Sequence, residues 1–413
     1  MEDRPQSRRV LHLASLSFPG GLPLGLVLVT LPAWLADQGV SATEIGLVGA
    51  AGLPWSFKFL WAPLLDRFAP PLLDRRRAFM VLAQIGLFFS IAALSLVPAQ
   101  RTTIVLVVAL AIALSSATQD IAMDAYAVEV LRPSEYGPAS GLRTTFYRLA
   151  MLVSGGAAIA LADQIPWSVV FLLVAFLFVP ATALTSFAPP APPSSDQAPA
   201  GLVQAIAQPI RALARGPRFL AVAAFVLLYK FGDAAALGMV SPFFRVGLGV
   251  SLTEIGFLQK TVGLIAIIAG TMTGGVLLPR LGLLRGLFVF GVFQALTSLL
   301  YAATAFSGGT RAIMYAAIIC EQAASGMATA ALLSLMMSVC EKRWAATQFA
   351  LLSSLMGVGR TLATMASGAL ADLLGYGGFF VLAAALGLPG LALIMALPRP
   401  PPEPTEATEA TEA

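Results

Sequence analysis

The chain has 413 residues, of which 58% are hydrophobic and only 11% are charged, whereas soluble domains are ~25% charged. This composition excludes an ordinary soluble globular protein and indicates an integral membrane protein. The net charge of +4 follows from the topology of the loops, described below, so we expect no nucleic-acid partner. The two cysteines have no metal-ligand spacing, and we expect neither a metal site nor a disulfide framework.

Apolar windows long enough to cross a ~30 Å bilayer core as helices recur along the chain. The predicted fold class is therefore all-α integral membrane, in contact with the lipid bilayer. We expect twelve transmembrane helices, at residues 12–36, 42–64, 79–97, 103–126, 138–161, 167–187, 219–240, 252–278, 286–306, 311–338, 345–370 and 376–397.

Lysine and arginine are distributed unevenly between the predicted loops. With the N-terminus inside, sixteen of them lie in cytoplasmic segments, and only Arg101, Arg245 and Arg311 lie on the opposite side. The positive-inside rule therefore places both termini in the cytoplasm. The other six basic residues lie within predicted helices: Lys58, Arg143, Arg148, Lys230, Lys260 and Arg360.

Two short motifs recur about half a chain apart. The sequence SATEIG at 41–46 returns as SLTEIG at 251–256, and ALAD at 160–163 returns at 369–372. These echoes indicate duplication into two parallel six-helix repeats, an arrangement that resembles the major facilitator superfamily. We expect an N-terminal six-helix half at 1–188, a cytoplasmic linker at 189–217, a C-terminal six-helix half at 218–397 and a disordered tail at 398–413.

The fourth predicted helix carries two carboxylates, Asp120 and Asp124. An ionisable group at bilayer depth costs ~2.5 kcal/mol or more unless it faces a partner, a bundle interior or water. The spacing of four residues places both on one helix face, beside the amide of Gln119. Asp124, near the helix end, is equally well explained by pairing with a neighbouring helix, whereas Asp120 lies about a turn deeper and is the better candidate for a functional carboxylate.

A basic and aromatic face is predicted on the second helix, where Trp55, Lys58 and Trp61 are spaced by three. This face could stack on a sugar ring and hold an anion. Equally, the tryptophans could mark the membrane interface while Lys58 extends to the surface. On the fifth helix, Arg143, Tyr147 and Arg148 follow the cytoplasmic entry, and at 1.5 Å per residue Arg148 reaches roughly mid-depth.

The predicted charges of the second half complete a pattern. Lys230 and Asp233 have the spacing of an intrahelical ion pair. The remaining candidates are Lys260 on the eighth helix, Glu321 and Gln322 on the tenth, and Arg360 on the eleventh. The third, sixth, ninth and twelfth helices carry no charge, so we expect them to face lipid while the others enclose a polar cavity. Six bases against four acids make this cavity positive, which favours an anionic or zwitterionic small-molecule substrate.

Several segments together resemble the AmpG-type muropeptide permeases. They are GLPL at 21–24, FKFLWAPLLDR at 57–67, SATQDI at 116–121, DA at 124–125 and YRLAMLVSGG at 147–156. The resemblance implies a major facilitator fold and proton-driven import of anhydromuropeptides across the bacterial inner membrane for cell-wall recycling. It also implies a gating role for the cluster between the second and third helices, for which topology control alone is the alternative: Asp66, Arg67, Arg75, Arg76 and Arg77.

The expected mechanism is proton symport by alternating access, with the proton as coupling ion and no cofactor. Asp120 is the first candidate for the proton-carrying group, and Glu321 and Asp124 are the others. The substrate would be bound by the intramembrane bases, by Trp55, Trp61 and Tyr147, and by Gln119, Asp233 and Gln322, although the bases could instead pair with the acids.

Other activities remain as alternatives. An importer of another anionic solute, such as a siderophore or acetyl-coenzyme A, is the main one, and a drug exporter fits less well because exporters usually favour an acidic cavity. Catalysis has little support, because the spans contain no Ser-His-Asp set, metal cluster or phosphate loop, so we expect a transporter and not an enzyme. We expect a monomer with no obligate protein partner.

Overall fold

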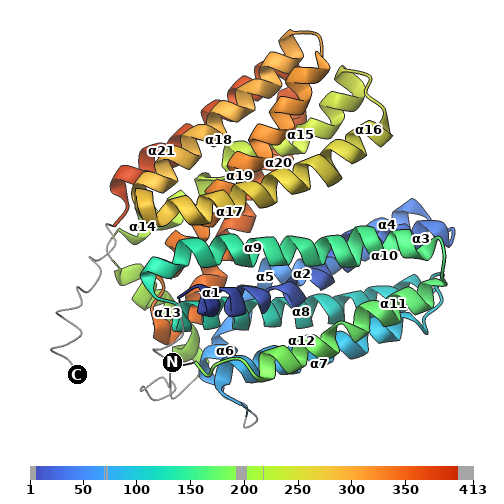
Figure 1. The fold of residues 1–413 in the computed structure, drawn as a ribbon, viewed down its shortest axis with the longest axis vertical. Coiled ribbons are helices and arrows are strands. Elements are labelled where there is room, and N and C mark those ends of the chain that lie inside the picture. The colour runs from blue at the N-terminus through green and yellow to red at the C-terminus, as the bar shows by residue number, and fades with distance from the viewer. Residues whose placement is uncertain (1–5, 69, 71–72, 192–201, 217, 399–413) are drawn as a thin grey trace. The chain divides into compact units, whose positions relative to one another are not determined.

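The computed structural model describes residues 6–68, 70, 73–191, 202–216 and 218–398 (Figure 1). The described residues are mostly helical and contain no β-strand. The chain forms two compact units. One takes in Met1–Val130, Leu142–Leu213 and Cys340–Val358, and the other takes in Leu131–Gly141, Ala214–Val339 and Gly359–Ala413. The predicted tail from residue 399 onward and the linker residues 192–201 and 217 lie outside the described residues, and the predicted division into two halves stays a prediction.

The helices of the first half of the chain follow the predicted crossings. They are α1 (Gln6–Ser15), α2 (Phe18–Gly25), η1 (Leu26–Thr30), α3 (Leu31–Asp37), α4 (Ala42–Val48), η2 (Gly49–Gly52), α5 (Leu53–Phe57), η3 (Lys58–Leu60), α6 (Ala62–Arg67), α7 (Arg75–Leu94), α8 (Thr102–Val130), η4 (Pro133–Glu135), α9 (Tyr136–Leu152), η5 (Val153–Ala157), α10 (Ala158–Ala162), α11 (Trp167–Phe176), α12 (Phe178–Ser186) and α13 (Leu202–Arg215). Within this set, α7 packs against α8, α11 and α12.

The second half of the chain is likewise built of long helices and short segments. They are α14 (Phe219–Leu228), α15 (Phe231–Pro242), η6 (Phe243–Gly247), α16 (Leu252–Phe257), η7 (Leu258–Val262), α17 (Gly263–Leu281), α18 (Leu283–Phe306), α19 (Arg311–Val339), η8 (Lys342–Trp344), α20 (Ala345–Leu386), α21 (Leu388–Leu393) and η9 (Ile394–Ala396). Here α19 packs against both α17 and α18. The all-α membrane fold is thus confirmed.

Ten stretches of the described chain are long and apolar enough to cross a bilayer. Two local features account for the difference from the twelve predicted crossings. The last stretch, Lys342–Ala396, contains two crossings separated at Gly375, whose φ of 68° lies in the left-handed region that favours glycine. The second predicted crossing is broken into α4, α5 and α6 by the 3-10 turns η2 and η3, so no single helix there reaches the required length.

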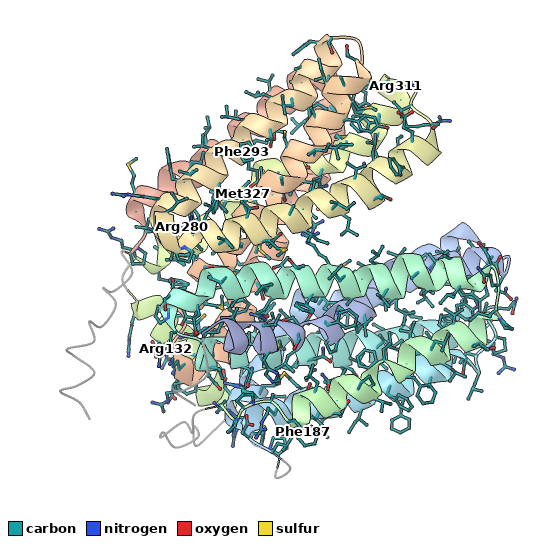
Figure 2. All side chains as sticks on the ribbon, viewed as in Figure 1. Arg132, Phe187, Arg280, Phe293, Arg311 and Met327 are labelled. Carbon is teal, nitrogen blue, oxygen red and sulfur yellow. The ribbon has the colours of Figure 1, made fainter. Side chains whose placement is uncertain are left out.

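Large apolar side chains cover the outer surface of the helices (Figure 2). The four spans predicted to face lipid all expose such side chains, with examples in Phe89, Phe176, Phe288 and Met395. In the absence of charge, a surface of this kind requires a hydrocarbon environment. Other spans also expose large apolar side chains, such as Val107, Ile265 and Met365, so the lipid-facing role of these four spans stays a prediction.

The first crossing is irregular, as its glycines and prolines predict. Its helix changes from α to π geometry at η1 before continuing as α3, and π segments of this kind are frequent at functional sites. Gly21 and Gly25 face the fifth crossing: a Cβ on Gly21 would overlap the carbonyl oxygen of Tyr147 on α9, and one on Gly25 would overlap Ser154 Oγ on η5. Small residues four apart thus let the two backbones meet.

Thr30 extends this contact between the first and fifth crossings. Its Oγ1 donates a hydrogen bond of 2.5 Å to the carbonyl oxygen of Ser154. The side chain is fully buried, so its hydroxyl needs such a partner. Together with the glycines, this bond fixes the position of α9, which carries several predicted site residues.

We predict that Gly21→Ala destabilises the protein, because its methyl group would overlap a backbone oxygen that cannot move aside. Overpacking of this kind costs about 1–3 kcal/mol. Thermal unfolding of the purified protein in detergent measures the effect. Gly52→Ala is the matched control, since a Cβ there meets no atom within 4 Å. Equal melting temperatures for the two variants would contradict the proposed close contact.

Candidate functional site

The carboxylate of Asp124 on α8 lies between two cations from other helices. Arg143 Nη2 of α9 donates to Asp124 Oδ1 at 2.7 Å, and Lys58 Nζ of η3 lies 3.6 Å from Asp124 Oδ2. Arg143 Nε also donates to Ser17 Oγ at 3.1 Å. The pairing that the sequence left open for Asp124 is therefore present, and it joins three crossings at one point.

Asp120 lies one turn away on the same helix and differs from Asp124 in its contacts. Among the described residues it has no hydrogen bond or salt bridge, although the charges of Lys58, Asp124 and Arg143 act on it. Gly20 leaves the space for its carboxylate: a Cβ there would lie 3.1 Å from Asp120 Oδ1 and 3.2 Å from Tyr147 Cε2. The site thus combines one paired and one unpaired carboxylate with two cations.

Two tryptophans flank Lys58, and both are fixed to α8. Trp55 Nε1 donates to Ser116 Oγ at 3.2 Å, and Trp61 Nε1 donates to Thr118 Oγ1 at 3.1 Å. Lys58 itself is only 8% exposed and is directed to Asp124, so it does not extend to the surface. These hydrogen bonds hold the indole rings in fixed orientations beside the charged cluster.

The remaining predicted residues of this unit lie near the same cluster. Tyr147 is close to Asp120, and the charge of Arg148 also acts on its hydroxyl group. Gln119 is 1% exposed, and within the described chain its Oε1 accepts no hydrogen bond. A buried acceptor without a donor is costly, and a bound solute with a hydroxyl or amide group would satisfy it.

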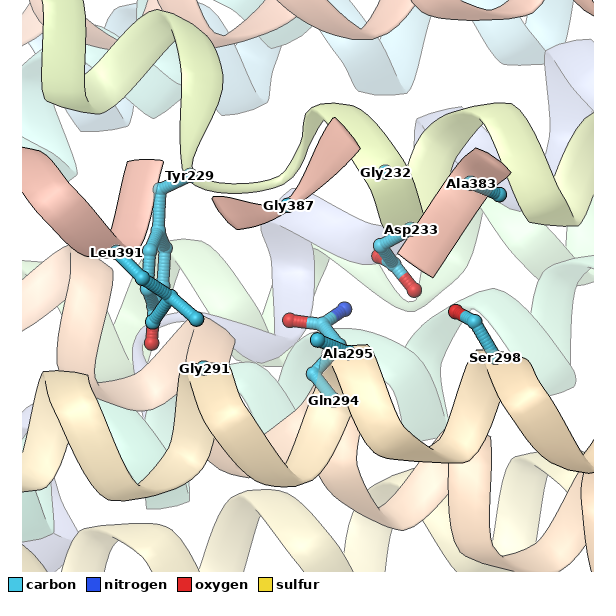
Figure 3. Close-up of a pocket in the computed structure, with 10 residues that line it drawn as sticks. All are labelled: Tyr229, Gly232, Asp233, Gly291, Gln294, Ala295, Ser298, Ala383, Gly387 and Leu391. Atoms are coloured by element: carbon cyan, nitrogen blue, oxygen red, sulfur yellow. The ribbon is translucent and has the colours of Figure 1, made fainter. Parts of the chain in front are cut away.

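The predicted ion pair of the second unit is present. Lys230 Nζ lies 2.9 Å from Asp233 Oδ2 and also donates to Ser325 Oγ at 2.8 Å and to its carbonyl oxygen at 3.2 Å. Figure 3 shows Asp233 beside Gln294 and Ser298 of α18, around a small cavity. Glu321 of α19 lies against the same group of side chains.

The other predicted residues of the second unit are not gathered there. The Gln322 side chain packs toward Gly263 at the start of α17, where a Cβ would lie 3.4 Å from its Cγ. Arg360 is exposed and takes no part in the Lys230 network. The side chain of Lys260 lies outside the described part of the structure. Their predicted roles in substrate binding stay predictions.

A buried charge network centres on Asp66 at the end of α6. Asp66 Oδ2 accepts hydrogen bonds from Thr347 N at 2.8 Å and Thr347 Oγ1 at 2.6 Å, at the beginning of α20. Its Oδ1 accepts from Arg76 Nη2 at 2.7 Å. A carboxylate on the first N–H groups of a helix satisfies orphan donors and interacts favourably with the helix dipole.

Arg76 is fully buried, and its second counter-charge is Glu129 near the end of α8. Arg76 Nη2 and Nε lie 2.6 Å and 2.8 Å from Glu129 Oε1. Arg75 joins this network through the carbonyl oxygen of Asp66 at 2.5 Å and through Glu129 at 3.4 Å. The cluster therefore ties α6, α7, α8 and the start of α20 together.

The other two predicted gating arginines lie outside this network. Arg77 pairs with Asp74 and donates to the carbonyl oxygen of Ala188 at 2.5 Å, which secures the end of the sixth crossing. Arg67 stacks on the ring of Phe68, 5.4 Å from its centroid. The role of the cluster in gating stays a prediction.

Sequence analysis missed two residues that complete these networks. Glu129 lies just beyond the predicted end of the fourth crossing, and the signal for it was the triple arginine, which requires an acid if any of its members is buried. Ser325 lies one turn after Glu321 on α19, and nothing in its sequence context distinguishes it from a packing residue.

Comparisons with known proteins agree with this architecture. The sequence model of the Major Facilitator Superfamily matches residues 13–364. The anhydromuropeptide permease of Escherichia coli (strain K12) is 37% identical over 392 residues, which cover 94% of this chain and 80% of that protein. The putative transporter AmpG 4 of Rickettsia felis is 28% identical over 399 residues, covering 94% and 96% of the two chains.

Solved structures of other facilitators have the same fold. The fucose:proton symporter FucP of E. coli superposes with a TM-score of 0.75 at 14% identity, covering 95% of this chain and 99% of that chain. The human organic anion transporter MFSD10 superposes with a TM-score of 0.74 at 17% identity, covering 95% of this chain and 100% of that chain. At such identities the likeness shows the fold alone. From the sequence match and the 37% identical relative, the chain belongs to the Major Facilitator Superfamily and, within it, to the AmpG-type muropeptide permease family.

Proposed function

We propose that this membrane transporter imports anhydromuropeptides across the bacterial inner membrane by proton symport and alternating access. The substrate class is supported by the 37% identical relative that is named an anhydromuropeptide permease. The observation that carries the mechanism is Asp120, which has no hydrogen bond or salt bridge in the described part of the chain, beside the paired Asp124. The positive-inside distribution of arginine supports cytoplasmic termini.

Charge balance at this cluster explains how a proton and an anion would bind together. With both acids ionised, Asp120 and Asp124 cancel the charges of Lys58 and Arg143. Protonation of Asp120 adds one net positive charge to the cluster, and a substrate carboxylate offsets that charge. Since each ligand favours the binding of the other, the two are transported together.

The rest of the cluster suits a sugar linked to an acidic peptide. The fixed indoles of Trp55 and Trp61 offer flat faces for sugar rings, and the Gln119 acceptor can take a hydroxyl or amide hydrogen. Arginine binds carboxylates in bidentate geometry, which gives Arg148 a role with the peptide. We expect release into the cytoplasm to require the Asp66 contact with the start of α20 to break, because that contact holds α6 against α20.

We predict that proteoliposomes containing the protein accumulate labelled anhydromuropeptide only when a proton gradient is imposed, acidic outside. Dissipating the gradient with a protonophore should reduce the internal concentration to the external one. The same vesicles are offered a ferric siderophore and labelled acetyl-coenzyme A in parallel. Accumulation of either of these without uptake of the muropeptide would assign a different anionic substrate, and accumulation without a gradient would exclude proton symport.

We predict that Asp120→Asn abolishes uphill uptake, because the amide cannot bind and release a proton. Exchange of labelled for unlabelled substrate should persist, since the permanently neutral side chain still leaves the cluster positive. Counterflow and gradient-driven uptake in the same vesicles separate the two effects. Asp163→Asn, at an exposed position, is the matched control and should behave as the unaltered protein. Normal accumulation by Asp120→Asn would contradict the assignment.

We predict that Asp66→Asn opens the cytoplasmic ends of the helices and speeds maleimide labelling of Cys340. Burial and the nearby charge of Asp66 raise the pKa of the Cys340 thiol, and only the thiolate reacts, so labelling of the unaltered protein should be slow. Removing the carboxylate lowers that pKa and releases the start of α20, and both effects accelerate the reaction. In a Cys320→Ser background, Cys340 is the single thiol that maleimide can label.

Arg67→Gln is the matched control for this labelling experiment. It removes a charge from the same loop without touching the Asp66 network. A several-fold higher labelling rate is expected for Asp66→Asn alone. Equal rates in both variants would show that Asp66 does not hold this end closed.

A further inference from the structure

We propose that Asp233 and Glu321 form a second proton-binding site, in which the two buried carboxyl groups share one proton. Asp233 lies on α15 and Glu321 on α19, and they are 8% and 1% exposed. Ser325, one turn after Glu321 on α19, donates to Asp233 Oδ2 at 3.2 Å, so the two carboxyl groups lie close together. Because a carboxylate can only accept, a hydrogen bond between two carboxyl groups needs a proton on one of them.

In each carboxyl group, one oxygen has a hydrogen-bond or ionic partner and the other has none among the described residues. Asp233 Oδ2 takes the Lys230 ammonium at 2.9 Å and a hydrogen bond from Ser325 Oγ at 3.2 Å. Glu321 Oε2 accepts from the hydroxyl of Tyr301 at 3.4 Å. Asp233 Oδ1 and Glu321 Oε1 are buried and have no donor in hydrogen-bonding geometry among the described residues, although the Gln294 amide is near enough to act on the Asp233 carboxyl group. These two oxygens are where the shared proton resides.

The charges facing the pair require this proton. Lys230 is the one cation that the described residues of this unit bring to it, against two acids. The other titratable groups are the phenols of Tyr301 on α18 and Tyr229 on α14, and the latter donates to the carbonyl oxygen of Leu287 at 2.8 Å. Two ionised carboxylates would leave one uncompensated negative charge in an apolar bundle. One proton makes the group neutral.

The surroundings hold the pair in place and leave room for water beside it. Tyr301 is fixed by ring contacts with Phe244 and Phe380. A cavity with room for about one water molecule lies beside Asp233 and is also lined by Gln294 and Ser298 (Figure 3). Both side-chain atoms of the Gln294 amide lack partners in the described chain. A proton delivered by a hydronium ion binds the carboxylate and releases water, so charge and atoms balance.

In the proposed transport cycle this site would carry a second proton, and that role rests on the proposed symport. Whether a proton is bound at the site does not depend on the symport. Its test therefore uses no substrate: infrared difference spectra of the purified protein, recorded in H2O and D2O, detect the carbonyl stretch of a protonated carboxyl group. An Asp120→Asn background removes any contribution from the first cluster.

In that background we expect a deuterium-sensitive carboxylic acid band at neutral pH. Glu321→Gln and Asp233→Asn should each remove it, because the remaining carboxylate can then pair with Lys230 and needs no proton. Tyr301→Phe should shift the band without removing it, since it deletes only the donor to Glu321 Oε2. Glu254→Gln, a change at the start of α16, is the matched control and should leave the band unaltered.

Two results would overturn the proposal: no protonated carboxyl band in the Asp120→Asn protein, or a band that persists in both Glu321→Gln and Asp233→Asn. Melting temperatures confirm that each variant is folded. If the band behaves as expected but vesicles fail to accumulate muropeptide, the proton site stands and the proposed substrate falls. If muropeptide is accumulated but the band is absent, the proposed substrate stands and the proton site falls.

Discussion

A charge inside an apolar helical bundle must have a counter-charge, a hydrogen-bond donor or a proton. The described structure meets this constraint in three ways. Asp124 has two cations, Asp66 has an arginine and the N–H groups of a helix, and Asp233 shares a single lysine with Glu321. The carboxylates with sufficient partners hold helices together. The groups with too few partners are those to which we assign a proton in the proposed mechanism.

Much of the first cluster could be predicted from sequence. The spacing of Asp120 and Asp124 fixes them on one helix face, and the rarity of charge in apolar spans places Lys58 and Arg143 among six basic residues that could pair with them. Sequence could not show which acid is paired, because that depends on how α8, α9 and η3 cross. The hydrogen bonds from the two indoles to Ser116 and Thr118 could not be predicted either, because they also depend on how the helices cross.

Errors in the predicted fold have a common physical cause. Hydropathy counts apolar side chains and does not register the backbone, so 42–64 was predicted as one helix although 3-10 turns divide it. At the last two crossings the prediction was correct: the predicted end at 370 and the predicted start at 376 lie on either side of the turn at Gly375. Glycine contacts such as Gly21 with Tyr147 follow from small-residue spacing in principle, but the partner helix becomes known only in three dimensions.

The division of the second crossing into α4, α5 and α6 has a consequence for biogenesis. A segment divided by two 3-10 turns contains α-helices of only seven, five and six residues, each far too short to cross the bilayer core as an isolated helix. Its Trp55 and Trp61 reach their hydroxyl partners only on α8. During synthesis, this segment must therefore await the emergence of the fourth crossing from the ribosome before it can settle in the membrane.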